Sequence, residues 1–258
     1  MTQRVLVTAG ASGIGLAITK AFAAAGAQVH ICDIDQAALD KATAGSDLVS
    51  GSIADVSDEA AVQRLLAEVD RRFGGLDVLV NNAGVSGPTA PAERYDRKGW
   101  RSVVDVNLNG TFFVTQEAIP LLRKSAQPDG RHASIIVMSS LAGRFGYPNR
   151  IAYATSKWGL IGFMKTLSLE LGPFGITCNA ILPGAVEGSR IQQVMQGRAS
   201  HSGRTVEEEL ERAYANQAVS KFVDPADIAA LVQFLAGPHG GSISGQSFPI
   251  DGDSKAAQ

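Results

Sequence analysis

The sequence predicts an α/β fold in which a doubly wound parallel sheet is flanked by helices, in a single domain spanning residues 1–258. Two observations carry this prediction. Short apolar runs rich in β-branched residues, typical of buried parallel strands, alternate with longer amphipathic stretches. Such alternation produces right-handed βαβ units, which place helices on both faces of one sheet. No internal repeat, low-complexity segment or long linker interrupts the pattern, so one domain is expected.

The pattern sets the expected boundaries of each element. The predicted strands cover residues 4–8, 28–33, 47–53, 76–81, 134–139 and 177–182. The main predicted helices cover residues 14–25, 59–73, 100–124 and 152–171. In a sheet of this kind, ligands bind beyond the carboxyl ends of the strands, so the residues that follow each strand are the candidates for a site.

Composition excludes several classes of function. The chain is 45% hydrophobic and 19% charged, with a formal net charge of -2 and no basic cluster. This balance argues against nucleic acid or an anionic membrane as the main partner. No signal segment and no bilayer-length apolar run is visible. Cys32 and Cys178 lie in apolar runs and indicate reduced core residues, so a cytoplasmic protein is expected. Four scattered histidines show no ligand spacing, so no catalytic metal is expected.

The first predicted strand ends in a glycine-rich turn that opens a helix. Residues 8–15 read TAGASGIG, and the helix stops at Gly26. Such a turn lets the backbone approach a pyrophosphate and directs the helix N-terminus at it. The pattern is typical of Rossmann-type sheets that bind dinucleotides. The candidate cofactor-binding residues of the turn are Gly10, Ser12, Gly13, Ile14 and Gly15.

The second predicted strand ends at Asp33, within the roughly twenty residues expected for a carboxylate that binds the adenosine ribose. A carboxylate there repels a 2′-phosphate, and no Arg or Lys stands in the turn or directly after Asp33. The sequence therefore favours NAD(H) over NADP(H). The alternative is an ordinary turn or N-cap aspartate before a helix that begins near Gln36.

The third and fourth predicted strands also end in polar residues. Asp55 and Val56 follow the third strand, and residues 81–84 (NNAG) close the fourth. Buried amides require hydrogen-bond partners, so the asparagines either tie neighbouring loops together or face a cofactor. Asn107, in the next helix, has the same requirement and is expected to bond a backbone group or an ordered water.

The fifth predicted strand ends near Ser140, and Tyr153 and Lys157 fall in the first turns of the helix that follows. Residues four apart lie on one helix face, so the phenol and the ammonium point the same way. An ordinary phenol ionises near pH ~10, so a tyrosine base at neutral pH needs roughly 4 kcal/mol of help. A cation about 4 Å away supplies that order of magnitude at an effective dielectric of ~20. The alternative is an exposed pair on a surface helix.

Taken together, these motifs resemble the short-chain dehydrogenase/reductase family in its compact, single-domain form. The resemblance spans nearly the whole chain and depends on the joint order and spacing of modest motifs. The matching positions are the glycine-rich turn, residues 82–84, Asn107, Ser140, Tyr153, Lys157, residues 183–184, residues 244–246 and residues 251–252. A run at 243–251 is similar to the family's last strand, which commonly helps to build a tetramer, so a homotetramer is expected.

The resemblance implies a role for each matching residue. Tyr153 would be the acid/base, and Lys157 would stabilise its ionised form while holding the nicotinamide ribose. Ser140 would hydrogen-bond the substrate oxygen, and Asn107 would position a water in a proton relay with Lys157. The remaining implied cofactor contacts are Asp33 to the adenosine ribose, Asp55 and Val56 to the adenine, Val186 to the carboxamide through its backbone, and Asn82, Ala83, Gly84, Pro183 and Gly184.

The chain departs from the family pattern at two positions. Ala9 stands where the family's first glycine usually lies, which reshapes the turn without necessarily blocking a phosphate. Gly188 stands where the family often has a threonine that contacts the carboxamide, so either Ser189 substitutes or the contact is missing.

Residues 187–221 are expected to form a mobile substrate lid. Gly188, Gly197 and Gly203 supply flexible points, and residues 206–214 have a helical pattern. Four basic residues of this segment either bind an anionic or polyhydroxylated substrate or are solvated helix faces: Arg190, Arg198, His201 and Arg204. The tail, residues 253–258, is expected to fray.

These observations favour an NAD(H)-dependent oxidoreductase that interconverts a secondary alcohol and its ketone by hydride transfer. Polyols, sugars, hydroxy acids and cyclic alcohols all fit as small-molecule substrates. One alternative is a 3-oxoacyl-thioester (acyl-carrier-protein) reductase that uses NADPH, which Asp33 argues against. An alternative of another class is a non-catalytic NAD(H)-binding sensor or scaffold, which has no need of the Ser140, Tyr153 and Lys157 set.

Overall fold

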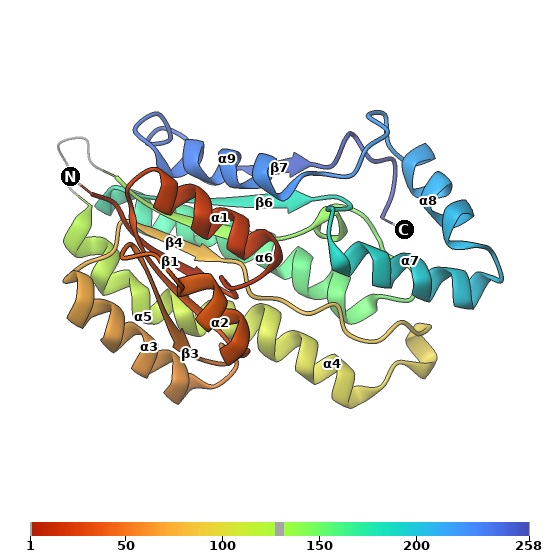
Figure 1. Ribbon diagram of the computed structural model, residues 1–258, viewed down its shortest axis with the longest axis horizontal. Helices are drawn as coiled ribbons and strands as arrows, with labels where there is room; N and C mark the ends of the chain where they lie inside the picture. Colours follow the sequence, from red (N-terminus) through yellow and green to blue (C-terminus); the bar gives the residue numbers. More distant parts are fainter. Residues whose placement is uncertain (1, 127–131, 258) are drawn as a thin grey trace.

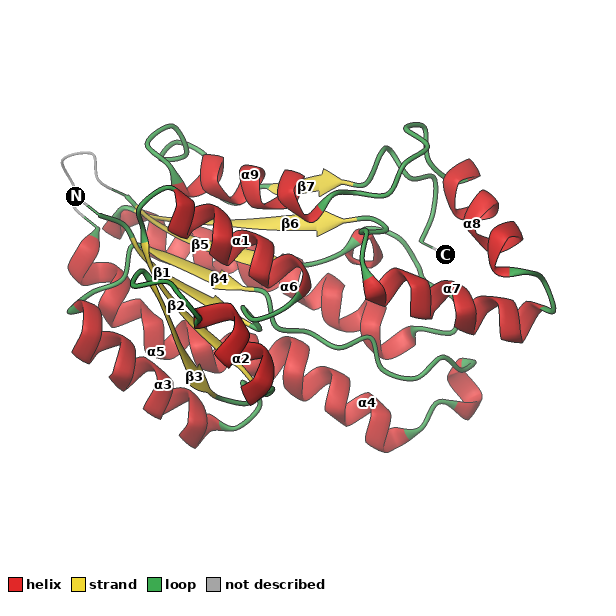
Figure 2. Ribbon diagram, in the orientation of Figure 1, coloured by secondary structure: helices red, strands yellow, loops and turns green. Residues whose placement is uncertain are grey.

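The computed structural model describes residues 2–126 and 132–257 and contains a seven-stranded parallel sheet (Figures 1 and 2). The strand order, β3-β2-β1-β4-β5-β6-β7, places β1 beside the central strand β4, and the chain winds outward from there in both directions. The strands are β1 Arg4–Thr8, β2 Gln28–Asp33, β3 Val49–Ile53, β4 Val78–Asn81, β5 Ala133–Met138, β6 Ile176–Pro183 and β7 Ser247–Ile250. The predicted doubly wound α/β fold is confirmed.

Strand boundaries differ from the predicted ones by at most a few residues. The largest difference is at β7, which begins at Ser247 rather than at residue 243. Gly245 adopts a left-handed backbone with φ of 69°, and its N–H donates to Cys178 O at 2.8 Å. This turn interrupts the extended conformation, so the strand can begin only after it.

Helices cover both faces of the sheet. The structure contains α1 Gly13–Ala24, α2 Gln36–Thr43, α3 Glu59–Phe73, α4 Arg97–Val104, α5 Gly110–Ser125, α6 Ile151–Leu171, α7 Ser189–Ser202, α8 Val206–Ala215 and α9 Pro225–Ala236. Helices α1, α2 and α9 pack on one face, and α3, α5 and α6 pack on the other. Helices α7 and α8 lie beyond the carboxyl ends of the strands (Figure 1).

Two helical predictions need correction. The single helix expected over residues 100–124 is divided into α4 and α5 by a π-helical turn, Asp105–Asn109. Such a turn inserts an extra residue into the helix and is frequent at functional sites. Gly197, expected to be a flexible point, lies inside α7, whereas Gly188 and Gly203 flank that helix with positive φ.

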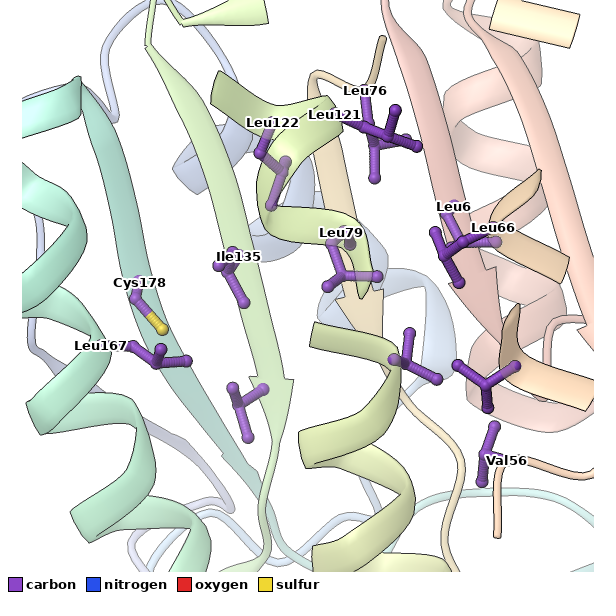
Figure 3. Packing of buried hydrophobic residues seen from close by; sticks show 14 of the residues in the cluster. Leu6, Val56, Leu66, Leu76, Leu79, Leu121, Leu122, Ile135, Leu167 and Cys178 are labelled. Atoms are coloured by element: carbon purple, nitrogen blue, oxygen red, sulfur yellow. The ribbon is translucent and has the colours of Figure 1, made fainter. Parts of the chain in front are cut away.

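The core on the α3, α5 and α6 face contains a row of side chains in register across four strands. Leu6 pairs with Leu79, Leu79 with Ile135, and Ile135 with Cys178. All four are fully buried, and Leu167 of α6 packs against the same cluster (Figure 3). Burial raises the pKa of the Cys178 thiol, as expected for an inert core cysteine. This rigid layer fixes the strand ends from which the site is built.

His30 gives the fold a pH dependence that can be measured. Its ring nitrogens lie 2.8 and 2.9 Å from the hydroxyls of Ser50 and Ser52, and it is fully buried in β2. Burial, with a smaller effect from the Arg72 guanidinium, lowers the pKa of His30 to about 4. The unfolded chain therefore binds a proton that the folded chain excludes between pH ~4 and ~6.5.

We expect His30 to destabilise the fold as pH falls through that window, by roughly 3 kcal/mol at its lower end. Above pH ~6.5 both states are neutral at this ring, so its contribution no longer changes. Urea unfolding of the wild type and of His30→Gln from pH 4 to 7.5 measures the difference. Parallel pH profiles for the two proteins would contradict the assignment.

Candidate active site

A cavity of ≈ 430 Å³ opens where the strands end. Its walls come from the glycine-rich turn, the ends of β4, β5 and β6, the start of α6, helices α7 and α8, and the last residues of the chain. Among the predicted site residues, the cavity is lined by Ser12, Gly13, Ile14, Asn82, Gly84, Ser140, Tyr153, Lys157, Pro183, Gly184 and Val186. The structure thus brings together predicted residues from five separate segments.

The glycine-rich turn presents the N-terminus of α1 to this cavity. Ser12 is the N-cap residue in an extended conformation, and its side chain makes no bond to the described residues of the helix. Gly13 has φ of 51°, and a β-carbon there would meet no heavy atom within 4 Å. Open space and unpaired helical N–H groups are what a pyrophosphate requires, so these residues fit a dinucleotide.

The departure at Ala9 has a conformational consequence. Ala9 adopts a left-handed backbone with φ of 49°, which costs an L-residue about 1–2 kcal/mol. Its carbonyl oxygen accepts a bond from the side-chain amide of Asn82 at 3.1 Å. The turn therefore keeps the shape that glycine would allow, and the neighbouring strand end holds it there.

Asp33 is the last residue of β2 and lies beside the glycine-rich turn. Its carboxylate accepts bonds from the backbone N–H of Ala11 at 3.3 Å and of Ile34 at 2.8 Å. These bonds fix the side chain at the sheet edge without placing a cation beside it. Asp33 is not the N-cap residue of α2, because Asp35 has that position, so the N-cap half of the alternative interpretation is wrong. The turn half agrees with the structure, since the Asp33 carboxylate also accepts the Asp35 N–H at 3.3 Å.

Asn82 ties two strand ends together. Its side-chain amide donates to Thr8 O at 3.0 Å as well as to Ala9 O. The Thr8 hydroxyl in turn accepts the backbone N–H groups of Asn82 and Ala83, each at 2.9 Å. The sequence left open whether the asparagines tie loops or face a cofactor, and Asn82 does tie loops while lining the cavity.

Tyr153 and Lys157 share one face of α6, as the four-residue spacing predicts. The ammonium of Lys157 lies 5.7 Å from the centroid of the Tyr153 ring, and it donates to Met138 O at 2.8 Å. Lys157 is only 4% exposed, whereas Tyr153 is half-buried and opens to the cavity. The interpretation as an exposed surface pair is wrong, because the cation lies in a largely water-excluded position.

Ser140 follows β5 and caps the short helical turn after it, where its hydroxyl accepts the Ala142 N–H at 3.2 Å. The preceding residue fixes its position, because the Ser139 hydroxyl donates to Lys157 O at 2.8 Å. Gly143 is required at this contact, since a β-carbon there would collide with the Ser139 hydroxyl. The end of β5 and helix α6 are thereby locked together.

Asn107 is fully buried in the π-helical turn and does not line the cavity. Its side chain exchanges two bonds with the backbone of Val85, at 2.8 and 3.0 Å, and donates to the Ser156 hydroxyl at 2.9 Å. A β-carbon built at Gly84 would lie 3.3 Å from both Asn107 Oδ1 and Lys157 Nζ. Asn107 therefore joins the loop after β4 to helix α6.

Beyond β6 the chain forms a short bridge between Val186 and Val223. Its two bonds run from Glu187 N to Val223 O, at 3.0 Å, and from Val223 N to Ala185 O, at 2.8 Å. In a parallel pair of this register, the N–H and C=O of Val186 itself point to the other side. The backbone contact that the resemblance implies for Val186 stays a prediction.

Seven predicted site residues lie outside the cavity lining. They are Gly10, Gly15, Asp33, Asp55, Val56, Ala83 and Asn107. Gly10 and Gly15 shape the turn from behind, because β-carbons there would collide with Ile31 and with Ala9 O. Val56 is buried against Gly110. Asp33 is the last residue of β2 and Asp55 comes two residues after the adjacent strand β3, so both lie at the same edge of the sheet.

Several cavity residues carry no recognisable signal in the sequence. Tyr147 and Arg150 come from the loop before α6, and Met195 comes from α7. The predicted frayed tail also differs from the structure: Ser254 and Ala257 are buried and line the cavity. No local pattern indicates such contacts, because they depend on segments that meet only in the folded chain.

The tail is held by hydrogen bonds to the end of α8. Lys255 N donates to Asn216 O at 2.9 Å, and the Asn216 amide donates to Ala256 O at 2.8 Å. Arg144, just after the Ser140 turn, forms an ion pair with Asp251 at 3.2 Å. Residue 258 lies outside the described part of the chain.

Helices α7 and α8 form a small layer of their own over the cavity. Met195, Ala213 and Phe222 make up its buried cluster. Arg204 is paired with Glu209 at 3.1 Å and is not among the cavity residues. The side chains of Ser189, Arg190 and His201 lie outside what the structure describes, so the substitute contact expected from Ser189 is not addressed.

Comparisons with known proteins agree with this geometry. A family model described as enoyl-(acyl carrier protein) reductase matches residues 8–252. The 3-oxoacyl-(acyl-carrier-protein) reductase of Thermotoga maritima is 34% identical over 251 residues, covering 96% of this chain and 95% of that protein. Among the described residues, no helix is long and apolar enough to cross a membrane.

Solved structures of other proteins are similar to this chain over nearly its whole length. A variant of actinorhodin polyketide ketoreductase with NADPH has a TM-score of 0.90 at 31% identity, covering 97% of this chain and 96% of that one. NAD+-bound xylitol dehydrogenase also has a TM-score of 0.90, at 29% identity, covering 97% of this chain and 98% of that one.

Proposed function

The chain belongs to the short-chain dehydrogenase/reductase family, and from that premise we propose that it oxidises a small secondary alcohol with NAD, or reduces the ketone with NADH. Family membership makes it an oxidoreductase that acts on hydroxyl and keto groups and uses a nicotinamide dinucleotide. The observation that carries the choice of reaction is the convergence of Ser140, Tyr153 and Lys157 on one cavity beside the α1 N-terminus. A non-catalytic sensor has no need of that convergence.

In this proposal the protein's residues hold the substrate and move one proton. The hydroxyls of Ser140 and Tyr153 bind the substrate oxygen, and Tyr153 takes the hydroxyl proton during oxidation or returns it during reduction. Lys157 stabilises the phenolate through its charge. Asn107 holds the loop after β4 against α6. The proton relay through Asn107 remains a prediction. The bound nicotinamide accepts or donates the hydride.

The dinucleotide would extend from the cavity along the sheet edge. Ser12, Gly13 and Ile14 would hold its phosphates, and Val186 would meet the carboxamide with its backbone. Asp33 would bind the adenosine ribose, with Asp55 and Val56 beside the adenine. No cation is bonded to Asp33 in these contacts, so a 2′-phosphate would meet a negative charge.

We expect Asp33→Ala to reduce the preference for NAD over NADP by about 10- to 100-fold. Removing the carboxylate removes its hydrogen bonds to the adenosine ribose of NAD, and it also removes its repulsion of the 2′-phosphate of NADP. The measurement is kcat/KM for each cofactor with one alcohol. Asp35→Ala is the matched control, since Asp35 only caps α2. An unchanged ratio in Asp33→Ala would show that another group selects the cofactor.

A second candidate is an NADPH-dependent 3-oxoacyl-thioester reductase. The observations that favour it are the similarity to ketoacyl reductases and the NADPH that accompanies one of them. Asp33 argues against it, but a 3-ketoacyl-(acyl-carrier-protein) reductase has also been solved in complex with NADH, so thioester chemistry and NADH are compatible.

One experiment separates the two candidates. Absorbance at 340 nm is followed for polyols, sugars, hydroxy acids and cyclic alcohols with NAD or NADP, and for 3-oxoacyl thioesters with NADH or NADPH. NAD-linked oxidation of one alcohol class would support the first candidate. Reduction of thioesters alone would replace it with the second, and tight NADH binding without any turnover would favour a sensor.

Three further features belong to this proposal. Residues 187–221 would open and close over the substrate, because their cluster is packed apart from the main core. A homotetramer is supported by apolar side chains exposed on α5 and α6, among them Phe112, Trp158 and Leu169. Reduced, buried Cys32 and Cys178 suit a cytoplasmic location.

A further inference from the structure

A partly buried ion pair joins the Ser140 turn, residues 140–143, to the last strand of the sheet. Arg144 follows that turn, and its Nη2 atom lies 3.2 Å from Oδ2 of Asp251, which follows β7. The two side chains are 31% and 4% exposed, so water screens this pair less than a surface pair. Neither residue lines the cavity, and the proposed chemistry uses neither. A carboxylate is costly to bury, so the position of Asp251 calls for an explanation.

Asp251 is held against the end of β6. A β-carbon built at Gly184 would lie 2.8 Å from Asp251 Cβ and 2.9 Å from Asp251 Cα, so the backbones of the two residues are in close contact. The Gly184 N–H donates to Ile250 O at 3.0 Å, which fixes this contact through the backbone. The Asp253 N–H donates to Asp251 Oδ1 at 3.1 Å and orients the carboxylate. Asp251 is therefore a fixed anchor beside Gly184, a cavity residue on the side that the proposed function assigns to the cofactor.

The guanidinium of Arg144 connects this anchor to the Ser140 turn. The backbone of Arg144 belongs to the turn, because its N–H donates to Leu141 O at 3.1 Å. The side chain leaves the turn and reaches Asp251. The ion pair thus spans from the residue that would hold the substrate oxygen, Ser140, to the segment that would hold the cofactor, at Gly184.

The contact between the two side chains depends on charge more than on aligned hydrogen bonds. Arg144 Nε and Asp251 Oδ2 are buried and make no hydrogen bond within the described part of the chain. The guanidinium is also held over the Phe145 ring, 4.6 Å from its centroid, and it donates to Ser254 O at 3.4 Å. A lysine at position 144 would keep the charge and lose the planar contacts, so it should replace the arginine only in part.

We propose that Arg144 and Asp251 are positioning residues for hydride transfer. Their ion pair holds the Ser140 turn against the end of β6 and so fixes the distance between a substrate oxygen at Ser140 and a cofactor beside Gly184. This inference rests on the proposed function, because that distance matters only if a hydride passes between the two. Reacting atoms must lie about 3–3.5 Å apart, and a misplacement of ~1 Å can cost about 100-fold in rate.

The test neutralises the pair in two steps, which separates positioning from stability. Arg144→Met leaves the buried Asp251 carboxylate without the Arg144 cation, so the melting temperature should fall by several degrees and kcat by about 10- to 100-fold. Arg144→Met/Asp251→Asn removes both charges, so the melting temperature should largely recover while kcat stays low. Arg144→Lys should retain more kcat than Arg144→Met. Rates are measured with NAD and the alcohol that the wild type oxidises fastest in the 340 nm panel.

Two further readouts distinguish a displaced turn from general damage. NADH affinity in the double variant should stay close to that of the wild type, because the backbone bond between Gly184 and Ile250 remains. Hydrogen exchange, followed by mass spectrometry without substrate, reports on the turn itself. The amides of residues 143–145 donate within or next to the turn, so they should exchange faster in the double variant, whereas those of α3 should not.

The control is Arg4→Met/Asp77→Asn. Arg4 and Asp77 form an ion pair of similar burial, 22% and 5% exposed, at the opposite ends of the strands. This change should alter the melting temperature without altering kcat or the exchange of residues 143–145.

Recovery of kcat together with the melting temperature in Arg144→Met/Asp251→Asn would show that the pair serves stability alone. Unchanged exchange at residues 143–145 would show that the pair does not hold the turn. Either result overturns the inference. If the wild type turns over no alcohol or ketone, the proposed function fails, and hydrogen exchange still decides whether the ion pair holds the turn.

Discussion

Tyr153→Phe is expected to lower kcat by at least about 10³-fold while leaving NADH affinity within a few-fold of the wild type. General acid–base catalysis typically contributes 10²–10⁴-fold, and this phenol also binds the substrate oxygen, so its removal should reach the upper part of that range. Phenylalanine keeps the edge-on contact with Tyr147 and the packing of α6. Kinetics with one alcohol and fluorescence titration with NADH measure the two quantities.

The matched control is Tyr214→Phe. Tyr214 lies on α8 with its ring centroid 4.7 Å from that of Phe222, and it is not a cavity residue. Loss of the Tyr214 hydroxyl, which lies in the layer formed by α7 and α8, should leave kcat unchanged. Comparable turnover in Tyr153→Phe and wild type would refute the assignment of the acid/base, whatever the substrate.

The fold and the centre of the site could be predicted because their signals are local. A buried parallel strand reveals itself by a continuous apolar run, as in Ile135 and its neighbours, and the residue after it must lie at the sheet edge. The pairing of Tyr153 with Lys157 follows from helical spacing alone. Asp33 could be located by counting from the glycine-rich turn.

The parts that could not be predicted depend on contacts between distant segments. The π-helical turn at Asn107 requires a partner at Val85 and another at Ser156, neither of which lies nearby in sequence. The tail looked polar and free to fray, yet Ser254 is buried because the end of α8 offers hydrogen bonds to its neighbours. The sequence left open whether Arg198 binds a substrate or is a solvated helix residue, and its bond to the Tyr147 hydroxyl joins residues 51 positions apart.

Lys157→Met is the second substitution with a large expected effect. The Lys157 ammonium lies 5.7 Å from the Tyr153 ring centroid, a separation at which unit charges interact by roughly 3 kcal/mol at an effective dielectric of ~20. Losing that interaction should lower kcat by about 100-fold, because the ammonium acts on the negative charge that develops on the phenol during proton transfer. Methionine preserves the buried apolar stem, so the loss should reflect the charge rather than packing.

A further measurement separates the two roles of Lys157. NADH affinity should also fall, because the ammonium that the proposal places on the nicotinamide ribose is gone, whereas Tyr153→Phe should retain that affinity. Lys165→Met, an exposed change on the same helix, is the control. If Lys157→Met and Lys165→Met gave the same kcat and NADH affinity, the buried ammonium would have no part in the chemistry, and Tyr153 would need another source of activation.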